Sequence, residues 1–279
     1  MHIDIPSEIA LIAGRGVYPL ILAESARQQG VKRIFALAFK GETERSLARH
    51  VDRIEWVRLG LLERAIEILR QSGARHAVMA GQIKPTHLFN LRFDKRMLAL
   101  LARLPVRNAD TIYGALAEEL RTLDIELLPA HRFMESTMPA PGTLTRRAPT
   151  EAERHDIALG LRAAKLTSGL DIGQTVVVKQ GTILAVEAFE GTNETLQRAF
   201  RLGREGCVIV KVAKRGHDTR FDIPVVGMQT MKMLHKGRAA VLAVEAGRTI
   251  LLEREKLVAA ADASGICIEA VRTDDESFA

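Results

Sequence analysis

The stretch IALIAGRGVYPLILAESARQQG, residues 9–30, decides the fold of the first half of the chain. An apolar run typical of a buried strand is followed by Gly14 and Gly16, and then by a helical segment that ends at Gly30. A strand, a glycine-containing turn and a helix in this order form the opening unit of dinucleotide-binding α/β domains. The rest of the chain must decide whether this turn binds a dinucleotide.

The alternation of strand-like and helix-like segments continues through the first half. We expect strands at 33–39, 52–59, 76–81 and 125–130, and helices at 61–73, 91–104 and 111–123. Strands that alternate with helices over short connections favour a parallel, doubly wound sheet. The predicted fold class of this half is therefore α/β and Rossmann-like.

The pattern breaks at MPAPGTLTRRAPT, residues 138–150, which contains three prolines and has no periodicity. We therefore divide the chain into an N-terminal Rossmann-like domain (1–138), a linker (139–150) and a C-terminal catalytic domain of mixed α/β structure (151–279). Thr150, with Glu153 three residues later, is a capping box that opens a helix over 151–169. Two β-rich runs around Gln180-Gly181 predict a hairpin.

Composition narrows the functional class. The 279 residues are 47% hydrophobic, and no apolar run reaches the length of a membrane span. The N-terminus lacks the features of a signal peptide, so we expect a cytoplasmic protein. Cys207 and Cys267 lie in strand-like runs and are read as buried hydrophobic residues. A net charge of +6 suits an anionic partner, but only 4% of residues are aromatic, which argues against single-stranded nucleic acid.

The opening turn lacks two features of a dinucleotide site. The position of the third glycine in G-x-G-x-x-G is Pro19, and no carboxylate stands at the end of the second predicted strand to bind a ribose. Backbone N–H groups near Gly14 and Gly16 can still bind an anion at the helix start. The alternative is that both glycines only permit a tight turn.

A second candidate is EAFEGTNETLQRA, residues 187–199, where a strand leads into a helix. Glu190 stands at the carboxyl end of the strand, Gly191 allows a ligand to approach the backbone, and the helix N-terminus offers N–H groups to a phosphate. The structural alternative is that Thr192 or Asn193 simply caps the helix.

A third candidate is KVAKRGHDTRFDIPVVG, residues 211–227, a non-periodic stretch that combines cations with two carboxylates. Phosphate-ester hydrolysis needs cations to neutralise charge and carboxylates to hold Mg²⁺ or orient water. Of Asp218 and Asp222 we favour Asp222, because the Ile-Pro that follows it restricts the backbone. The alternative is a solvated charge run, in which Asp222 only pairs with Arg220 or a lysine.

The order of these motifs resembles a known family. LIAGRGVYPL, AGQIKP, ADTIYGALAEEL, PAPGTLT, LDIGQTVVV, ILAVEAFEGTNE and KVAKRGHDTRFDIPVVG together are similar to the LpxI-type UDP-2,3-diacylglucosamine pyrophosphatases, which act in lipid A biosynthesis of Gram-negative bacteria. The resemblance extends from about Ile9 to Val271.

The resemblance implies a two-domain enzyme with a lipid substrate between the domains. It implies hydrolysis of UDP-2,3-diacylglucosamine to 2,3-diacylglucosamine 1-phosphate and UMP with Mg²⁺, or Mn²⁺ in its place. Asp222 and Glu190 are the expected catalytic residues, and both are expected to bind metal together with Asp171. The expected substrate-binding residues are Gly14, Gly16, Gln82, Asp110, Gln174, Gly191, Thr192, Asn193, Lys211, Lys214 and Arg220. The expected location is peripheral on the inner face of the cytoplasmic membrane, and a homodimer is plausible.

Two departures from the family pattern stand out. Asn193 replaces the aspartate of the E-G-T-D motif, and Lys214-Arg215-Gly216-His217 replaces the usual Lys-Pro-x-Gln. With Asn193 in place of the aspartate, the identity of the metal ligands stays undecided. The changed loop sequence adds one cation. Two other classes remain as alternatives: an NAD(P)-dependent oxidoreductase, and a non-catalytic protein that binds nucleotides or nucleic acid.

Overall fold

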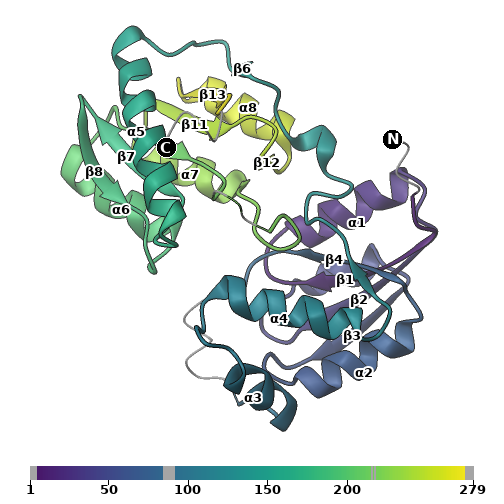
Figure 1. Cartoon of the computed structure of the whole chain (residues 1–279). Coiled ribbons are helices and arrows are strands. Elements are labelled where there is room, and N and C mark those ends of the chain that lie inside the picture. Colours follow the sequence, from purple (N-terminus) through teal and green to yellow (C-terminus); the bar gives the residue numbers. More distant parts are fainter. Residues whose placement is uncertain (1–4, 84–91, 215, 217, 274–279) are drawn as a thin grey trace. The chain divides into compact units, whose positions relative to one another are not determined.

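The computed structural model describes residues 5–83, 92–214, 216 and 218–273, and it divides the chain into two compact units (Figure 1). Unit 1 comprises Met1–Met134 and Asp218–Phe221. Unit 2 comprises Glu135–His217 and Asp222–Ala279. The chain therefore leaves unit 2 for the four residues 218–221 and returns to it at Asp222.

The segment 139–150, expected as a linker, is part of unit 2. Gly142–Thr143 form strand β6, which pairs with the last strand of the unit 2 sheet. The Leu144 N–H donates to the carbonyl of Ile268 (2.9 Å), and the Gly247 N–H donates to the carbonyl of Pro139 (2.8 Å). The prolines interrupt helical and strand periodicity, but the neighbouring backbone groups still pair with the sheet.

Unit 1 is a parallel five-stranded sheet in the order β3-β2-β1-β4-β5. Its strands are β1 (Glu8–Ala13), β2 (Arg33–Phe39), β3 (Arg53–Val57), β4 (His76–Ala80) and β5 (Glu126–Leu127). Its helices are α1 (Tyr18–Gln28), the 3₁₀ helix η1 (Arg45–Arg49), α2 (Leu62–Ser72), α3 (Lys95–Ala102) and α4 (Ala109–Arg121). The predicted doubly wound parallel sheet is confirmed, although β5 is only two residues long.

Three apolar residues at helical spacing place one face of α2 in the core of unit 1. Leu62, Ile66 and Leu69 on α2 are all buried, in one apolar cluster with β2, α3 and α4. Phe221 packs against the same cluster, and its ring lies 5.5 Å from that of Tyr113 on α4. Together with a hydrogen bond from the Ala130 N–H to the Thr219 carbonyl (2.7 Å), this contact holds the segment 218–221 on unit 1.

The glycine at position 14 is required by the chain that follows β4. The Gly14 N–H donates to the Ala80 carbonyl (2.8 Å), and the Arg15 N–H donates to the Gln82 carbonyl (2.7 Å). A Cβ atom at Gly14 would lie 2.7 Å from the Gln82 carbonyl oxygen, which is closer than such contacts allow. Gly16 has open space around it but adopts φ +89°, a conformation that favours glycine. The close approach of the two turns explains why position 14 requires glycine.

Substitution of Gly14 by alanine should therefore destabilise the protein. We expect Gly14→Ala to lower the free energy of unfolding by about 1–3 kcal/mol, because an overpacked position must shift backbone atoms. Gly114 on α4 is the matched control: it has open space, and alanine there should stabilise the helix by up to about 1 kcal/mol. Denaturant melts of both variants test this, and a Gly14→Ala variant as stable as wild type would refute the packing explanation.

Unit 2 is built on a six-stranded mixed sheet in the order β6-β13-β11-β9-β7-β8. Its long strands are β7 (Thr175–Lys179), β8 (Thr182–Val186), β9 (Val208–Lys211), β11 (Val241–Glu245) and β13 (Cys267–Val271). Strands β9, β11 and β13 are mutually parallel, whereas β7 runs antiparallel to both β9 and β8. The predicted hairpin turns at Gln180 (φ 49°) and Gly181 (φ 74°), the two positive angles of a tight hairpin.

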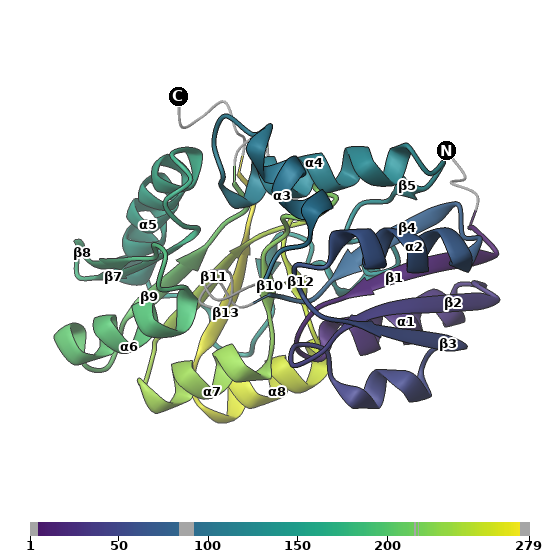
Figure 2. The same ribbon diagram turned by 90° about the horizontal axis from the view of Figure 1, so that it is seen from below.

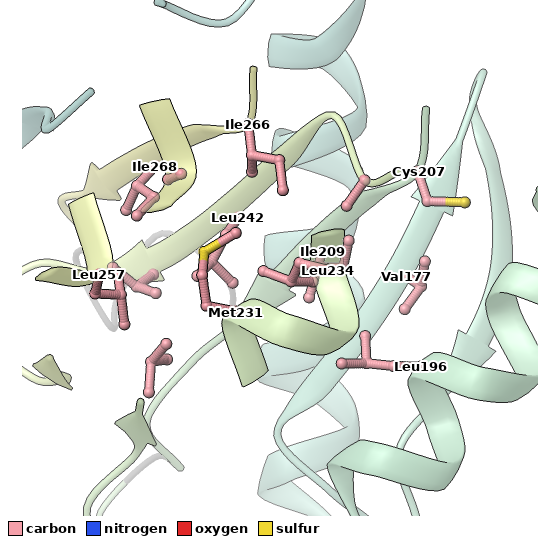
Figure 3. Close-up of a cluster of buried hydrophobic side chains, with 14 of the residues drawn as sticks. Val177, Leu196, Cys207, Ile209, Met231, Leu234, Leu242, Leu257, Ile266 and Ile268 are labelled. Atoms are coloured by element: carbon pink, nitrogen blue, oxygen red, sulfur yellow. The ribbon is translucent and has the colours of Figure 1, made fainter. Parts of the chain in front are cut away.

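Helices cover both faces of this sheet (Figure 2). Helix α5 (Glu151–Gly169) begins with the predicted capping box and packs on one face. Helices α6 (Thr192–Gly203), α7 (Met228–Lys236) and α8 (Arg254–Ala263) pack on the other face, around the apolar side chains drawn in Figure 3. Both cysteines are free and buried, as predicted. Strand β12 (Ile250–Leu251) pairs with β10 (Val225–Val226) in a separate two-stranded sheet. None of the helices in the described ranges is long and apolar enough to cross a bilayer.

Candidate active site

One edge of the unit 2 sheet collects polar side chains that strand direction brings together. Because β7 is antiparallel to β9 and β8, its first residue lies beside the last residue of β9 and the end of β8. Thr175, Lys211 and Glu187 therefore meet at this edge. Thr175 pairs with Lys211 in the sheet, and the Glu187 N–H donates to the Thr175 carbonyl (2.8 Å).

Glu187 was not among the residues that the sequence singled out. Its side chain is buried, one carboxylate oxygen accepts a hydrogen bond from the Thr192 hydroxyl (2.8 Å), and Oε2 is buried with no partner among the described residues. Its backbone lies against Gly173, where a Cβ would come within 2.2 Å of the Glu187 carbonyl oxygen. The only signal in the sequence was an acidic residue directly after a strand in VEAFEG, which the more prominent Glu190 obscured.

Lys211, a predicted substrate-binding residue, ends β9 and is buried. Its ammonium group donates to the hydroxyl of Thr192 (3.1 Å) and to that of Thr175 (3.3 Å). Within the described part of the chain it forms no salt bridge to a carboxylate. A buried cation with only hydroxyl partners has positive charge available for an anionic ligand.

Neither Thr192 nor Asn193 caps helix α6, although the sequence offered this as an alternative. Its N-cap is Gly191, with φ +81°, and no side chain caps the helix. Thr192 and Asn193 occupy its first two positions, and the Thr192 hydroxyl bonds to Glu187 instead of the helix N–H groups. The N-terminus of α6 is therefore a place where an anion can bind.

Glu190, predicted as a catalytic residue and metal ligand, is held by α6. It accepts hydrogen bonds from Arg198 (2.7 Å) and Thr195 (3.2 Å). Burial raises its pKa, but hydrogen bonds from its own backbone, Arg198 and Thr195 lower the pKa by more, so the net value is below the ordinary one. Glu190 is therefore an ionised, ion-paired carboxylate and is poorly suited to act as a general acid.

The structure separates the two acids of the loop 211–227. Asp218 takes three hydrogen bonds from the guanidinium group of Arg220, at 2.5–3.0 Å, and these hydrogen bonds raise the pKa of Arg220. Asp222 instead accepts a hydrogen bond from the side-chain amide of Gln174 (3.3 Å). Arg220, one of the partners considered for Asp222, is thus bound to Asp218.

The start of this loop is fixed by a buried ion pair. Lys165 on α5 and Glu245 at the end of β11 are both 1% exposed, with the ammonium 2.8 Å from the carboxylate. Glu245 also accepts the Ala213 N–H (2.8 Å), and Lys165 donates to the Ala213 carbonyl (3.0 Å). The next residue, Lys214, pairs with Asp171 (3.0 Å). This network holds the residues that follow Lys211 against the sheet.

The three carboxylates expected to bind metal do not form one group. Asp171 pairs with Lys214, Glu190 with Arg198, and Asp222 with Gln174. Across the described residues no group of three or more histidine, cysteine, aspartate or glutamate side chains could hold a metal ion. Two buried side-chain oxygens, Gln174 Oε1 and Glu187 Oε2, have no hydrogen-bond partner among the described residues. A metal site of the predicted composition is thus not formed in this structure.

The remaining predicted residues lie in unit 1. Gly14 and Gly16 lie in the turn after β1, and Gln82 forms an isolated bridge with Arg15 there. Asp110 falls in the first turn of α4, and its side chain lies outside the described part of the structure. Gly14 has a packing role, so it gives the oxidoreductase alternative no support.

Loss of one partner of the buried pair should cost much more stability than loss of an exposed one. We expect Lys165→Met to lower the free energy of unfolding by about 3–5 kcal/mol, because Glu245 would remain charged and buried. Arg238→Met is the control: its pair with Glu205 is exposed, and its loss should cost less than about 1 kcal/mol. Equal melting temperatures for the two variants would contradict the importance of the buried pair.

Comparison with known proteins decides the family. The LpxI N-terminal domain matches residues 8–137, and the LpxI C-terminal domain matches residues 140–269. The chain belongs to the LpxI family. It is 31% identical over 274 residues to the UDP-2,3-diacylglucosamine pyrophosphatase LpxI of Caulobacter vibrioides, covering 94% of this chain and 96% of that protein. The resemblance seen in the ordered motifs is confirmed.

Two solved structures show weak likeness. One is the biotin carboxylase domain of the Hydrogenobacter thermophilus 2-oxoglutarate carboxylase with MgADP, ADP and bicarbonate (12% identity, TM-score 0.28). The other is phosphoribosylglycinamide synthetase from Anaerococcus prevotii (14% identity, TM-score 0.26). The matches cover 69% and 72% of this LpxI-family chain, but only 40% and 44% of those chains.

Proposed function

We propose that this protein hydrolyses the diphosphate of UDP-2,3-diacylglucosamine in lipid A biosynthesis, releasing 2,3-diacylglucosamine 1-phosphate and UMP. The near full-length similarity to the Caulobacter vibrioides pyrophosphatase carries the proposal. The polar edge of unit 2 supports it, because this edge combines a buried ammonium with an uncapped helix N-terminus. Both features stabilise the negative charge of a diphosphate.

In this proposal Lys211 and the N-terminus of α6 bind the diphosphate, and Thr192, Asn193 and Gly191 line that terminus. Lys214 adds a second, partly exposed ammonium group beside Asp171. These cations offset the charge that builds up as the phosphorus–oxygen bond breaks. Arg220, Gln82, Gly14, Gly16 and Asp110 remain proposed substrate contacts from the family resemblance.

Asp222 is the proposed base that orients the attacking water. The amide of Gln174 donates to one carboxylate oxygen and so fixes the orientation of the group. A carboxylate held in this way can accept a proton from water as the water attacks phosphorus. Glu190, ion-paired with Arg198, fits better as a group that holds the start of α6 than as an acid.

Cofactor and partners remain proposals from the resemblance. Mg²⁺ or Mn²⁺ dependence is expected for the reaction, although the described carboxylates do not form a ligand group. The lipid substrate implies work at the inner face of the cytoplasmic membrane, with the protein bound peripherally. No nucleic-acid partner is proposed, and a homodimer is an open expectation.

Incubation of the pure protein with UDP-2,3-diacylglucosamine tests the function directly. Mass spectrometry should show UMP and 2,3-diacylglucosamine 1-phosphate in equal amounts, with turnover that stops in EDTA and returns with Mg²⁺. Full turnover in EDTA would remove the metal requirement. No cleavage with any divalent ion would refute the proposed function.

Asp222 should be essential for turnover but not for folding. We expect Asp222→Ala to lower kcat at least about a hundredfold with little change in melting temperature, because general-base assistance contributes about 10²–10⁴-fold. Asp222→Asn should be nearly as inactive, since it keeps the shape and loses the charge. Asp262→Ala, which removes a unit 2 carboxylate bound to the Arg146 N–H, is the control and should keep wild-type kcat. An Asp222→Ala variant within about threefold of wild type would exclude Asp222 as the base, since that is under 1 kcal/mol of barrier.

A further inference from the structure

The ammonium group of Lys211 is arranged to keep one donor available. An ammonium group has three N–H donors. Two of them point to the hydroxyls of Thr192 (3.1 Å) and Thr175 (3.3 Å), and the third has no acceptor among the described residues. Lys211 is only 8% exposed, so water screens this charge weakly.

Glu187 lies one hydroxyl away from that charge. The Thr192 hydroxyl has a single proton, which it donates to the Glu187 carboxylate (2.8 Å), and its lone pairs accept from Lys211. The chain of donors therefore runs in one direction, from Lys211 through Thr192 to Glu187. Glu187 is itself 8% exposed, and its second oxygen has no partner in the described part of the chain.

A direct ion pair between Glu187 and Lys211 would leave less positive charge available to a ligand. If Glu187 contacted Lys211 directly, it would use the N–H donors that a ligand needs and would neutralise much of the charge. The hydroxyl between them links the carboxylate to the ammonium group through hydrogen bonds, while one N–H of Lys211 stays available.

We propose that Glu187 is a positioning residue that acts through the Thr192 hydroxyl to hold the ammonium group of Lys211 directed at a diphosphate oxygen of the substrate. The identity of this ligand rests on the proposed function. The arrangement of the three residues at the end of the sheet does not. Glu187 touches neither the diphosphate nor the reacting atoms in this proposal, so its influence must pass entirely through Lys211.

Binding of UDP without metal ion, measured by calorimetry, tests the inference in a double-mutant cycle. Lys211→Met should weaken UDP binding by about tenfold or more, because it removes a charge-assisted hydrogen bond. Glu187→Gln should weaken it by at least about threefold, and the double variant should bind within about twofold of Lys211→Met alone, because coupled residues do not add.

Two further variants separate this role from simple structural support. Thr192→Ser keeps the hydroxyl and should bind UDP within about twofold of wild type, whereas Thr192→Val should match Glu187→Gln. Asp156 is the matched control, because it is also a buried carboxylate and accepts the backbone N–H groups of Gln180 and Gly181. Asp156→Asn should lower the melting temperature and leave UDP affinity unchanged.

Independent effects of Glu187→Gln and Lys211→Met would overturn the inference, as would unchanged affinity in Lys211→Met or a wild-type protein that does not bind UDP. If Glu187→Gln does not fold, the difference in UDP affinity between Thr192→Ser and Thr192→Val tests whether the Thr192 hydroxyl is needed to position Lys211. A protein that binds UDP with the expected coupling but cleaves no UDP-2,3-diacylglucosamine would refute the proposed function and leave this inference standing. If the protein cleaves the substrate, but Glu187→Gln and Lys211→Met both bind UDP as wild type does, the proposed function stands and this inference is refuted.

Discussion

The buried positive charge of Lys211 is the constraint on which the polar edge of unit 2 depends. A lysine that is 8% exposed and has no described carboxylate beside it is costly unless hydrogen bonds and a nearby negative charge compensate. Thr175 and Thr192 supply the hydrogen bonds, and Glu187 supplies the charge through Thr192. The antiparallel placement of β7 between β8 and β9 brings these groups to one edge.

A second buried lysine, Lys165, fixes the backbone at Ala213, two residues after Lys211. Lys165 and Glu245 pair directly and also bind both backbone groups of Ala213, so the chain beyond β9 is fixed where it leaves the sheet. That direct pair is closed to ligands, whereas Lys211 keeps a donor available. Lys165 thus supports the backbone, whereas Lys211 is available to an anion.

Much of the fold could be predicted because local signals were strong. Thr150 and Glu153 marked the start of α5, Gln180-Gly181 marked the hairpin, and the spacing of Leu62, Ile66 and Leu69 marked the buried face of α2. The features that could not be predicted depend on long-range pairing. Residues 142–143 join a strand more than a hundred positions away, and β12 pairs with β10 outside the main sheet. The partner of Asp222 and the importance of Glu187 likewise depend on contacts that spacing along the chain does not reveal.

The central claim is that the end of the unit 2 sheet at Lys211 and α6 receives the diphosphate. A crystal structure of the inactive Asp222→Asn variant with uncleaved UDP-2,3-diacylglucosamine tests it most directly. The account predicts a diphosphate oxygen within hydrogen-bonding distance of Lys211 Nζ and of the first N–H groups of α6. A diphosphate bound at the turn of Gly14 and Gly16, with Lys211 still bonded only to its two threonines, would contradict it.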